Sequence, residues 1–127
     1  MHAVLAFSAL PLFLGALLSD WAYARTYEVQ WTNFASWLIA GGLVFAGPAL
    51  LWGAVELLRP VATRRPRAGL YLLLLLAGFV IGLANALVHA RDAWAAMPAG
   101  LVLSVAVLLL TAVASIIGLV GLRRGTA

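Results

Sequence analysis

The sequence contains no cysteine and no lysine, and its 127 residues include only four acidic residues and two histidines. Without cysteine, the chain forms no disulfide, binds no metal through thiolates and has no cysteine nucleophile. The few carboxylates and histidines show no metal-ligand spacing, and there is neither a nucleophile–base pattern nor a phosphate-binding glycine loop. We therefore expect no enzymatic activity, no metal site and no cofactor.

Apolar residues are abundant, making up 65% of the chain against about 45–50% in soluble globular proteins. A soluble domain of this size has too little interior to bury them. They form four stretches, 3–19, 34–58, 68–88 and 97–122, each close to or above the roughly 20 residues that cross a bilayer as a helix. The sequence therefore predicts one transmembrane domain over 1–127. Its fold is an all-α integral membrane four-helix bundle in the lipid bilayer, with helices at about 3–20, 33–58, 68–89 and 97–122.

The arginines lie mostly on one side of these stretches. Six of the eight fall between the second and third stretches or after the fourth: Arg59, Arg64, Arg65, Arg67, Arg123 and Arg124. Loops rich in arginine stay in the cytoplasm, so we expect antiparallel up-down topology with both termini cytoplasmic. The loop from Arg59 to Arg67 then forms a basic membrane surface with affinity for anionic head groups. Because these arginines flank apolar spans, the net charge of +4 does not indicate nucleic acid binding.

The first stretch has two interpretations. Its length fits a signal peptide, and Ala22-Tyr23-Ala24 resembles a cleavage site. However, a signal peptide has a positively charged segment before its apolar run, and here no arginine or lysine precedes that run. We expect a retained first helix.

Polar residues meet at the opposite, extracytoplasmic membrane face. Antiparallel packing brings helix ends to similar depth, and the residues concerned are Asp20, Asn33, Ser36, Asn85 and His89. One interpretation is a binding site for a quinone headgroup or another small ligand, with Asp20 and His89 as a proton-exchanging pair. The other is helix capping at the level where water begins, which tryptophans also mark.

Small residues at four-residue spacing predict close helix packing. On the third stretch they are Gly78, Gly82 and Ala86, and on the fourth a similar face holds Ser104, Thr111, Ser115 and Gly118. Such faces either hold one bundle together or join two copies of the chain. Glu56, three residues before Arg59, predicts an ion pair at the membrane surface. The alternative for Glu56, a proton or cation site, would need a second carboxylate nearby.

Haem ligated by two histidines needs both of them in the bundle core. The histidines here are His2 and His89, which the predicted topology places at opposite membrane faces. They cannot bind one iron within a single bundle.

Two segments, Leu10–Asp20 and Ala35–Leu43, together with the arginine-rich turn into the third helix, resemble a bacterial family of small four-span membrane proteins, domain of unknown function 2231. The resemblance implies four helices and an integral membrane location, but no activity. Family members often carry a His-Pro pair before the first helix and a histidine near the start of the third. Here the first is absent or reduced to His2, and Tyr71 stands close to the second, which argues against a redox or metal role.

These observations favour a non-enzymatic subunit or scaffold of the bacterial inner membrane. It would pack against itself as a homo-oligomer or within a larger membrane complex. The alternative is a quinone- or lipid-binding module whose polar site lies at the extracytoplasmic end.

Overall fold

The structure, a computed structural model, describes residues 2–65 and 67–124, with side chains described for 4–65 and 67–121. The elements are α1 (His2–Thr26), α2 (Val29–Leu57), the 3-10 helix η1 (Val61–Thr63), α3 (Ala68–His89), α4 (Ala93–Ala96) and α5 (Ala99–Arg124). Within these residues, four helices are long and apolar enough to cross a membrane, namely α1, α2, α3 and α5. The predicted all-helical membrane fold is confirmed.

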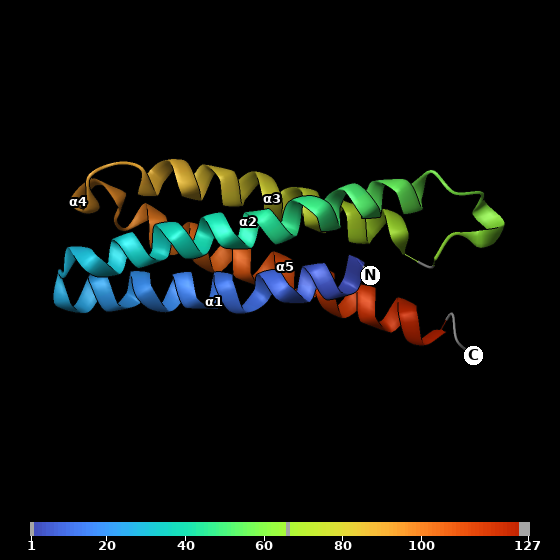
Figure 1. Cartoon of the computed structure of the whole chain (residues 1–127), viewed down its shortest axis with the longest axis horizontal. Coiled ribbons are helices and arrows are strands. Elements are labelled where there is room, and N and C mark those ends of the chain that lie inside the picture. The colour runs from blue at the N-terminus through green and yellow to red at the C-terminus, as the bar shows by residue number, and fades with distance from the viewer. Residues whose placement is uncertain (1, 66, 125–127) are drawn as a thin grey trace.

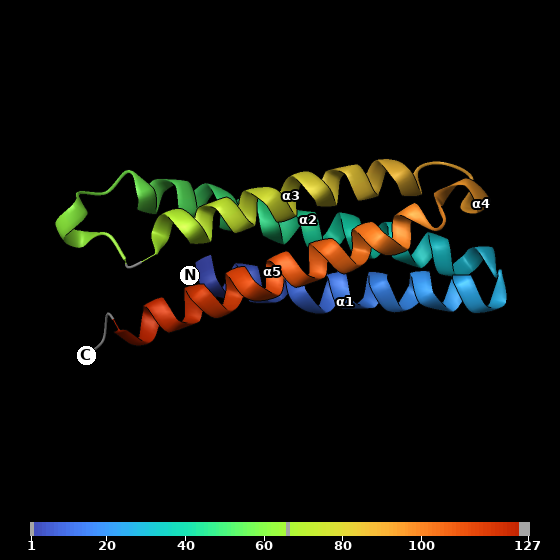
Figure 2. The same ribbon diagram turned by 180° about the vertical axis from the view of Figure 1, so that it is seen from behind.

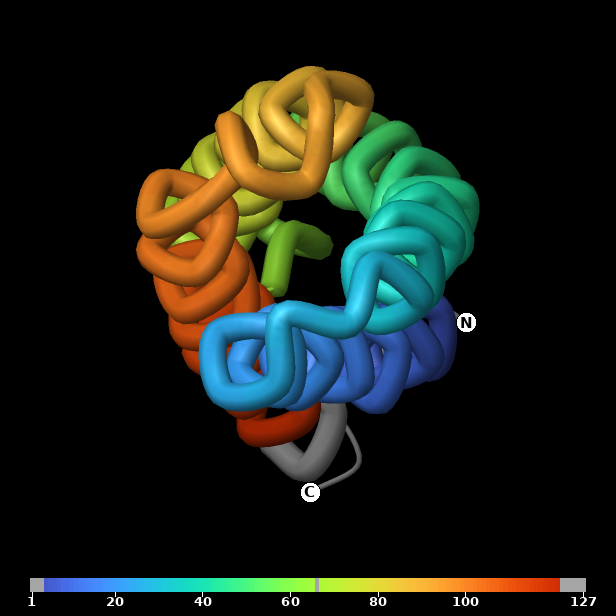
Figure 3. The backbone as a smooth tube through the Cα atoms, turned by 90° about the vertical axis from the view of Figure 1, so that its left-hand side faces the viewer, coloured from blue at the N-terminus to red at the C-terminus, as the bar shows by residue number. Residues whose placement is uncertain are grey.

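The four long helices form a ring (Figure 3) in which α1 packs on α2, α2 on α3, α3 on α5 and α5 on α1. Helices α1 and α3 therefore lie across the ring from each other. The loop with η1, the start of α1 and the end of α5 lie toward one end of the bundle, which we call the arginine end. The α1–α2 turn and α4 lie at the other end, the α4 end (Figures 1 and 2).

Most large apolar side chains face outward, and alanines make up much of the buried interior. Leu51 is 70% exposed and Leu87 is 72% exposed, whereas Ala9, Ala35 and Ala49 are fully buried. This distribution suits lipid, because an apolar side chain gains little by moving from lipid into protein, and helices associate by close backbone approach. Helices also satisfy their backbone polar groups internally, which the hydrocarbon requires.

The connection between α1 and α2 is shorter than the sequence predicted. We expected a loop over 21–32, but only Tyr27 and Glu28 lie between the two helices. The segment after Asp20 is polar and aromatic but contains no glycine or proline, so nothing ends the helix there. The helix ends at Thr26. The next residue, Tyr27, is left-handed (φ 58°) and donates its N–H to the Tyr23 carbonyl oxygen at 2.8 Å, which is a common form of helix C-cap. The connection between α3 and α5 was also predicted as a loop, but its residues Ala93–Ala96 form α4.

Glycines of the packing faces meet side chains of the same chain. A Cβ on Gly82 would lie 2.9 Å from Leu43 Cδ2 of α2, and one on Gly78 would lie 3.5 Å from Thr111 Oγ1 of α5. Ala86, the third predicted packing residue, is half-buried. The face of α3 that carries Gly78 and Gly82 thus packs against other helices of the same bundle.

The tightest approach joins α1 and α2 at Gly42, where an added Cβ would lie 2.5 Å from Phe13 Cε1. We expect Gly42→Ala to destabilise the bundle by about 1–3 kcal/mol, because the buried Phe13 ring would have to move. Thermal or denaturant unfolding in detergent measures the change. Adding Phe13→Leu would restore much of the loss, and Gly121→Ala, with no atom within 4 Å of the new Cβ, is the control. Equal stability of Gly42→Ala and Gly121→Ala would contradict this packing.

Candidate functional site

A buried polar network joins three helices at the α4 end. Its members are Asp20 of α1, Asn85 and His89 of α3, and Ser104 of α5, each at most 5% exposed. His89 Nε2 lies 2.7 Å from Asp20 Oδ1. The Ser104 hydroxyl donates to Asp20 Oδ2 and accepts from Asn85 Nδ2 at 2.8 Å. We call these four residues the Asp20 network.

Local sequence explains how these side chains reach the interior. Asp20 follows Phe13 and Ala16 on the buried face of α1, at the three- to four-residue spacing of one helical face. Asn85 and His89 continue the face of α3 that holds Gly78 and Gly82. On α5, Gly100 leaves room for the imidazole, since an added Cβ would lie 2.7 Å from His89 Cε1.

The hydrogen bonds fix most of the protons. His89 Nδ1 lies 3.0 Å from the backbone oxygen of Asn85, which only accepts, so Nδ1 carries a proton. Nε2 faces a carboxyl oxygen, and one further proton lies between these two atoms. The pair is an imidazolium with a carboxylate, or an imidazole with a carboxylic acid, and both forms have zero net charge. A neutral, hydrogen-bonded pair is the form in which ionisable groups are tolerated away from water.

The structure does not bring all five predicted polar residues together. Asn33 is exposed, and Ser36 donates to the carbonyl oxygen of Thr32 in its own helix at 2.9 Å. Helix α2 turns these two side chains away from the network. Ser104, which the sequence suggested only as a packing residue, and Gly100, which it did not single out, complete the arrangement.

A second polar group lies at the arginine end. Glu56 is buried, and its Oε2 lies 3.1 Å from Arg59 Nη1, which is the ion pair predicted from sequence. Its Oε1 lies 3.9 Å from Arg65 Nε. Arg64 donates to the Arg59 carbonyl oxygen at 3.1 Å, and Arg67 is exposed. Arginines of the basic loop thus interact with the backbone of the loop and with Glu56.

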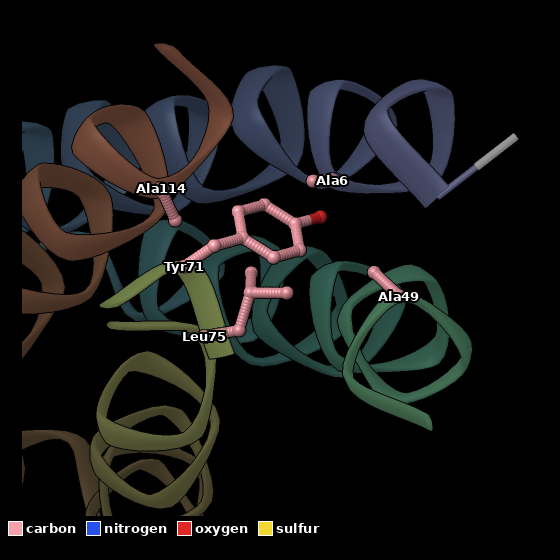
Figure 4. Packing of buried hydrophobic residues seen from close by; sticks show 5 residues of the cluster. All are labelled: Ala6, Ala49, Tyr71, Leu75 and Ala114. Atoms are coloured by element: carbon pink, nitrogen blue, oxygen red, sulfur yellow. The ribbon is translucent and has the colours of Figure 1, made fainter. Parts of the chain in front are cut away.

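The Tyr71 ring fills the centre of the bundle near Glu56. It lies among alanines of the other three helices, Ala6, Ala49 and Ala114 (Figure 4). Glycines flank it, since an added Cβ would lie 3.0 Å from the ring at Gly118 and 3.4 Å at Gly53. The space left between Glu56, Arg65 and Tyr71 is a cavity of about 20 Å³, enough for about one water molecule.

Among the residues that the structure describes, no three His, Asp or Glu side chains are grouped so as to hold a metal ion. The side chains of His2, Arg123 and Arg124, which entered the sequence predictions, lie outside the described residues.

A family model described as predicted membrane protein (DUF2231) matches residues 1–121. The chain belongs to this family. No curated protein and no solved structure matches it. The DUF2231 match agrees with the four membrane-length helices and confirms the resemblance seen in the sequence. Tyr71 is a buried phenol between Gly53 and Gly118.

We predict that Asp20 and His89 are energetically coupled. Asp20→Ala and His89→Ala would each cost about 1–3 kcal/mol, because each leaves a buried polar partner unsatisfied. The double variant would cost less than the sum by about 1 kcal/mol or more. Unfolding in detergent measures all three. Asn33→Ala, which removes an exposed side chain, is the control and would change stability by less than about 0.5 kcal/mol. Additive costs of the two single substitutions would contradict the coupling.

Proposed function

We propose that this DUF2231 protein is a non-enzymatic structural subunit of a bacterial inner membrane, which packs its four-helix bundle against a membrane partner or a second copy. The observation that carries the proposal is the closure of the Asp20 network. The Asp20 and His89 side chains are 0% exposed, and both carboxyl oxygens of Asp20 are hydrogen-bonded within the chain.

A catalytic or ligand-binding group must reach its substrate. In the Asp20 network Asn85 Oδ1 is a buried acceptor without a partner, but three side-chain hydrogen bonds connect α1, α3 and α5, including the diagonal pair α1 and α3. This is the arrangement expected of a clamp between helices, because interhelical hydrogen bonds hold membrane helices in a fixed register. At the arginine end the helices are joined by packing instead, since the Tyr71 ring lies between glycines of α2 and α5.

The outward surface supports a role in association. Exposed leucine, valine and phenylalanine side chains cover the long helices. Among the described residues, the middle of this outward surface has no ionisable side chain, and the surface can face lipid or a partner. Such a surface allows association, because van der Waals packing is one of the interactions that join membrane helices.

The proposed orientation is antiparallel up-down with both termini cytoplasmic. It is supported by the arginine end, where η1 and its flanking arginines lie together with the start of α1 and the end of α5 (Figure 1). Loops rich in arginine are retained in the cytoplasm.

We predict that a reporter fused after Ala127 shows a cytoplasmic location, and that a reporter inserted at Tyr27–Glu28 shows a location outside the cytoplasm. Paired fusions to alkaline phosphatase and a fluorescent protein measure this. Phosphatase activity of the C-terminal fusion would contradict the orientation.

The subunit role predicts that the chain, extracted in mild detergent, has a protein mass larger than that of one copy in light scattering. The Asp20→Ala/His89→Ala variant, whose helices lose their clamp, would be recovered as a single copy, whereas the Asn33→Ala control would keep the larger mass. A wild-type chain that is a single copy under the same conditions would contradict the subunit role.

The alternative of a quinone- or lipid-binding module meets an obstacle at Asp20, Asn85 and His89, because these side chains are enclosed and bonded to each other. A ligand at the α4 end needs a different, open place.

A further inference from the structure

An open cleft lies at the α4 end, one helical turn beyond Asp20. It has a volume of about 300 Å³ and is lined by six residues of α1, α4 and the segments that follow these two helices: Tyr23, Ala24, Tyr27, Trp94, Met97 and Pro98. This volume is at the lower bound of the roughly 300–1,000 Å³ of small-molecule sites, which also share its predominantly apolar and aromatic lining. Among the cavities of the described residues, the one beside Glu56, at about 20 Å³, is too small for anything beyond water.

Aromatic rings give the cleft its shape. Tyr23 is 4% exposed, whereas Tyr27 and Trp94 are 65% and 77% exposed. The Tyr27 ring meets the Tyr23 ring edge-on, with centroids 6.1 Å apart. It faces the Trp94 ring at 6.4 Å with an angle of 31° between their planes. The left-handed backbone of Tyr27 (φ 58°) is a sparsely populated conformation for a bulky residue, and it places this ring between the other two.

The lining favours a flat, uncharged ring. Ring pairs attract at centroid separations of about 4.5–7 Å. The Tyr27 and Trp94 rings already form such a pair, so a ring that enters the cleft extends this row of rings instead of entering between them. The charged residues at the end of α1 and in the two connections at the α4 end, Arg25, Glu28, Arg91 and Asp92, cancel in formal charge and provide no net attraction for an ion. Arg25 already lies over the Trp21 ring at 5.6 Å.

The donors of the lining favour a ring that carries acceptors. Tyrosine hydroxyls and the tryptophan N–H donate hydrogen bonds, and such side chains lie where the apolar membrane meets water. A quinone combines a planar neutral ring, two carbonyl acceptors and an apolar tail that follows lipid. We propose that the cleft binds the ring of a membrane quinone. This binding site goes beyond the structural role and does not involve the side chains of the Asp20 network.

The test uses tryptophan fluorescence of the full chain in detergent, quenched by a benzoquinone with a short alkyl tail. In one variant Trp94 is the remaining tryptophan, with the other four changed to phenylalanine. In the matched control Trp37 remains instead, since it is 79% exposed on α2 and does not line the cleft. We expect saturable quenching of Trp94 and only linear, collisional quenching of Trp37. Linear quenching of both would overturn the proposal.

A second variant fills the cleft. Ala24 lines it, so Ala24→Phe on the Trp94 background would raise the Kd of the probe about tenfold or more. Ala40→Phe, at an exposed position of α2, would leave it unchanged. If Ala24→Phe lowers helical content, Ala24→Leu takes its place. Saturable quenching with an unchanged Kd in a folded cleft-filled variant would show that the ring binds elsewhere.

The same titration distinguishes a quinone from a lipid. A short-chain phospholipid is added in competition with the quinone probe, and we expect no loss of the saturable component. If the phospholipid removes it, the cleft is a lipid site and the quinone assignment is wrong. Because the measurement is made on the isolated chain, its outcome is independent of whether the protein also acts as a subunit.

Discussion

The Asp20 carboxyl group sets the constraint on which the α4 end of the bundle depends. It is fully buried, and a buried carboxyl group is stable only when its polar atoms have hydrogen-bond partners. His89 and Ser104 are these partners, and they come from two other helices. The requirement fixes the rotation of α1, α3 and α5 together, places Gly100 against the imidazole, and sets the position of the aromatic cleft one turn further along α1.

The two ends of the bundle repeat one arrangement. Tyr71 and His89 are eighteen residues apart on α3, and the glycines that they contact, Gly118 and Gly100, are eighteen residues apart on α5. Eighteen residues are about five helical turns, so each pair shares one face. Each ring also has a carboxylate near it, Asp20 at one end and Glu56 at the other. Aromatic or imidazole rings seated on glycine thus connect the helices at both ends.

Much of this architecture could be predicted from the sequence, because lipid imposes length and polarity on every span. Depth arguments placed Asp20, Asn85 and His89 at one level, and they are in contact or share a partner there. The same arguments included Asn33 and Ser36, which face elsewhere, because depth does not determine the rotation of a helix about its axis. That rotation follows from side-chain packing between helices. For this reason the role of Ser104, the place of Gly100 and the turn at Tyr27 became visible only in three dimensions.

The diagonal contact across the ring also bears on assembly. His89 and Ser104 follow Asp20 by 69 and 84 residues, so α1 is synthesised long before the side chains that neutralise its carboxyl group. During that interval the hairpin of α1 and α2 holds an acidic group without its partners. A carboxyl group near the end of a span lies close to the head groups, where water reaches it. The hydrogen bonds of Asp20 are therefore complete only once both α3 and α5 have packed against the first helix.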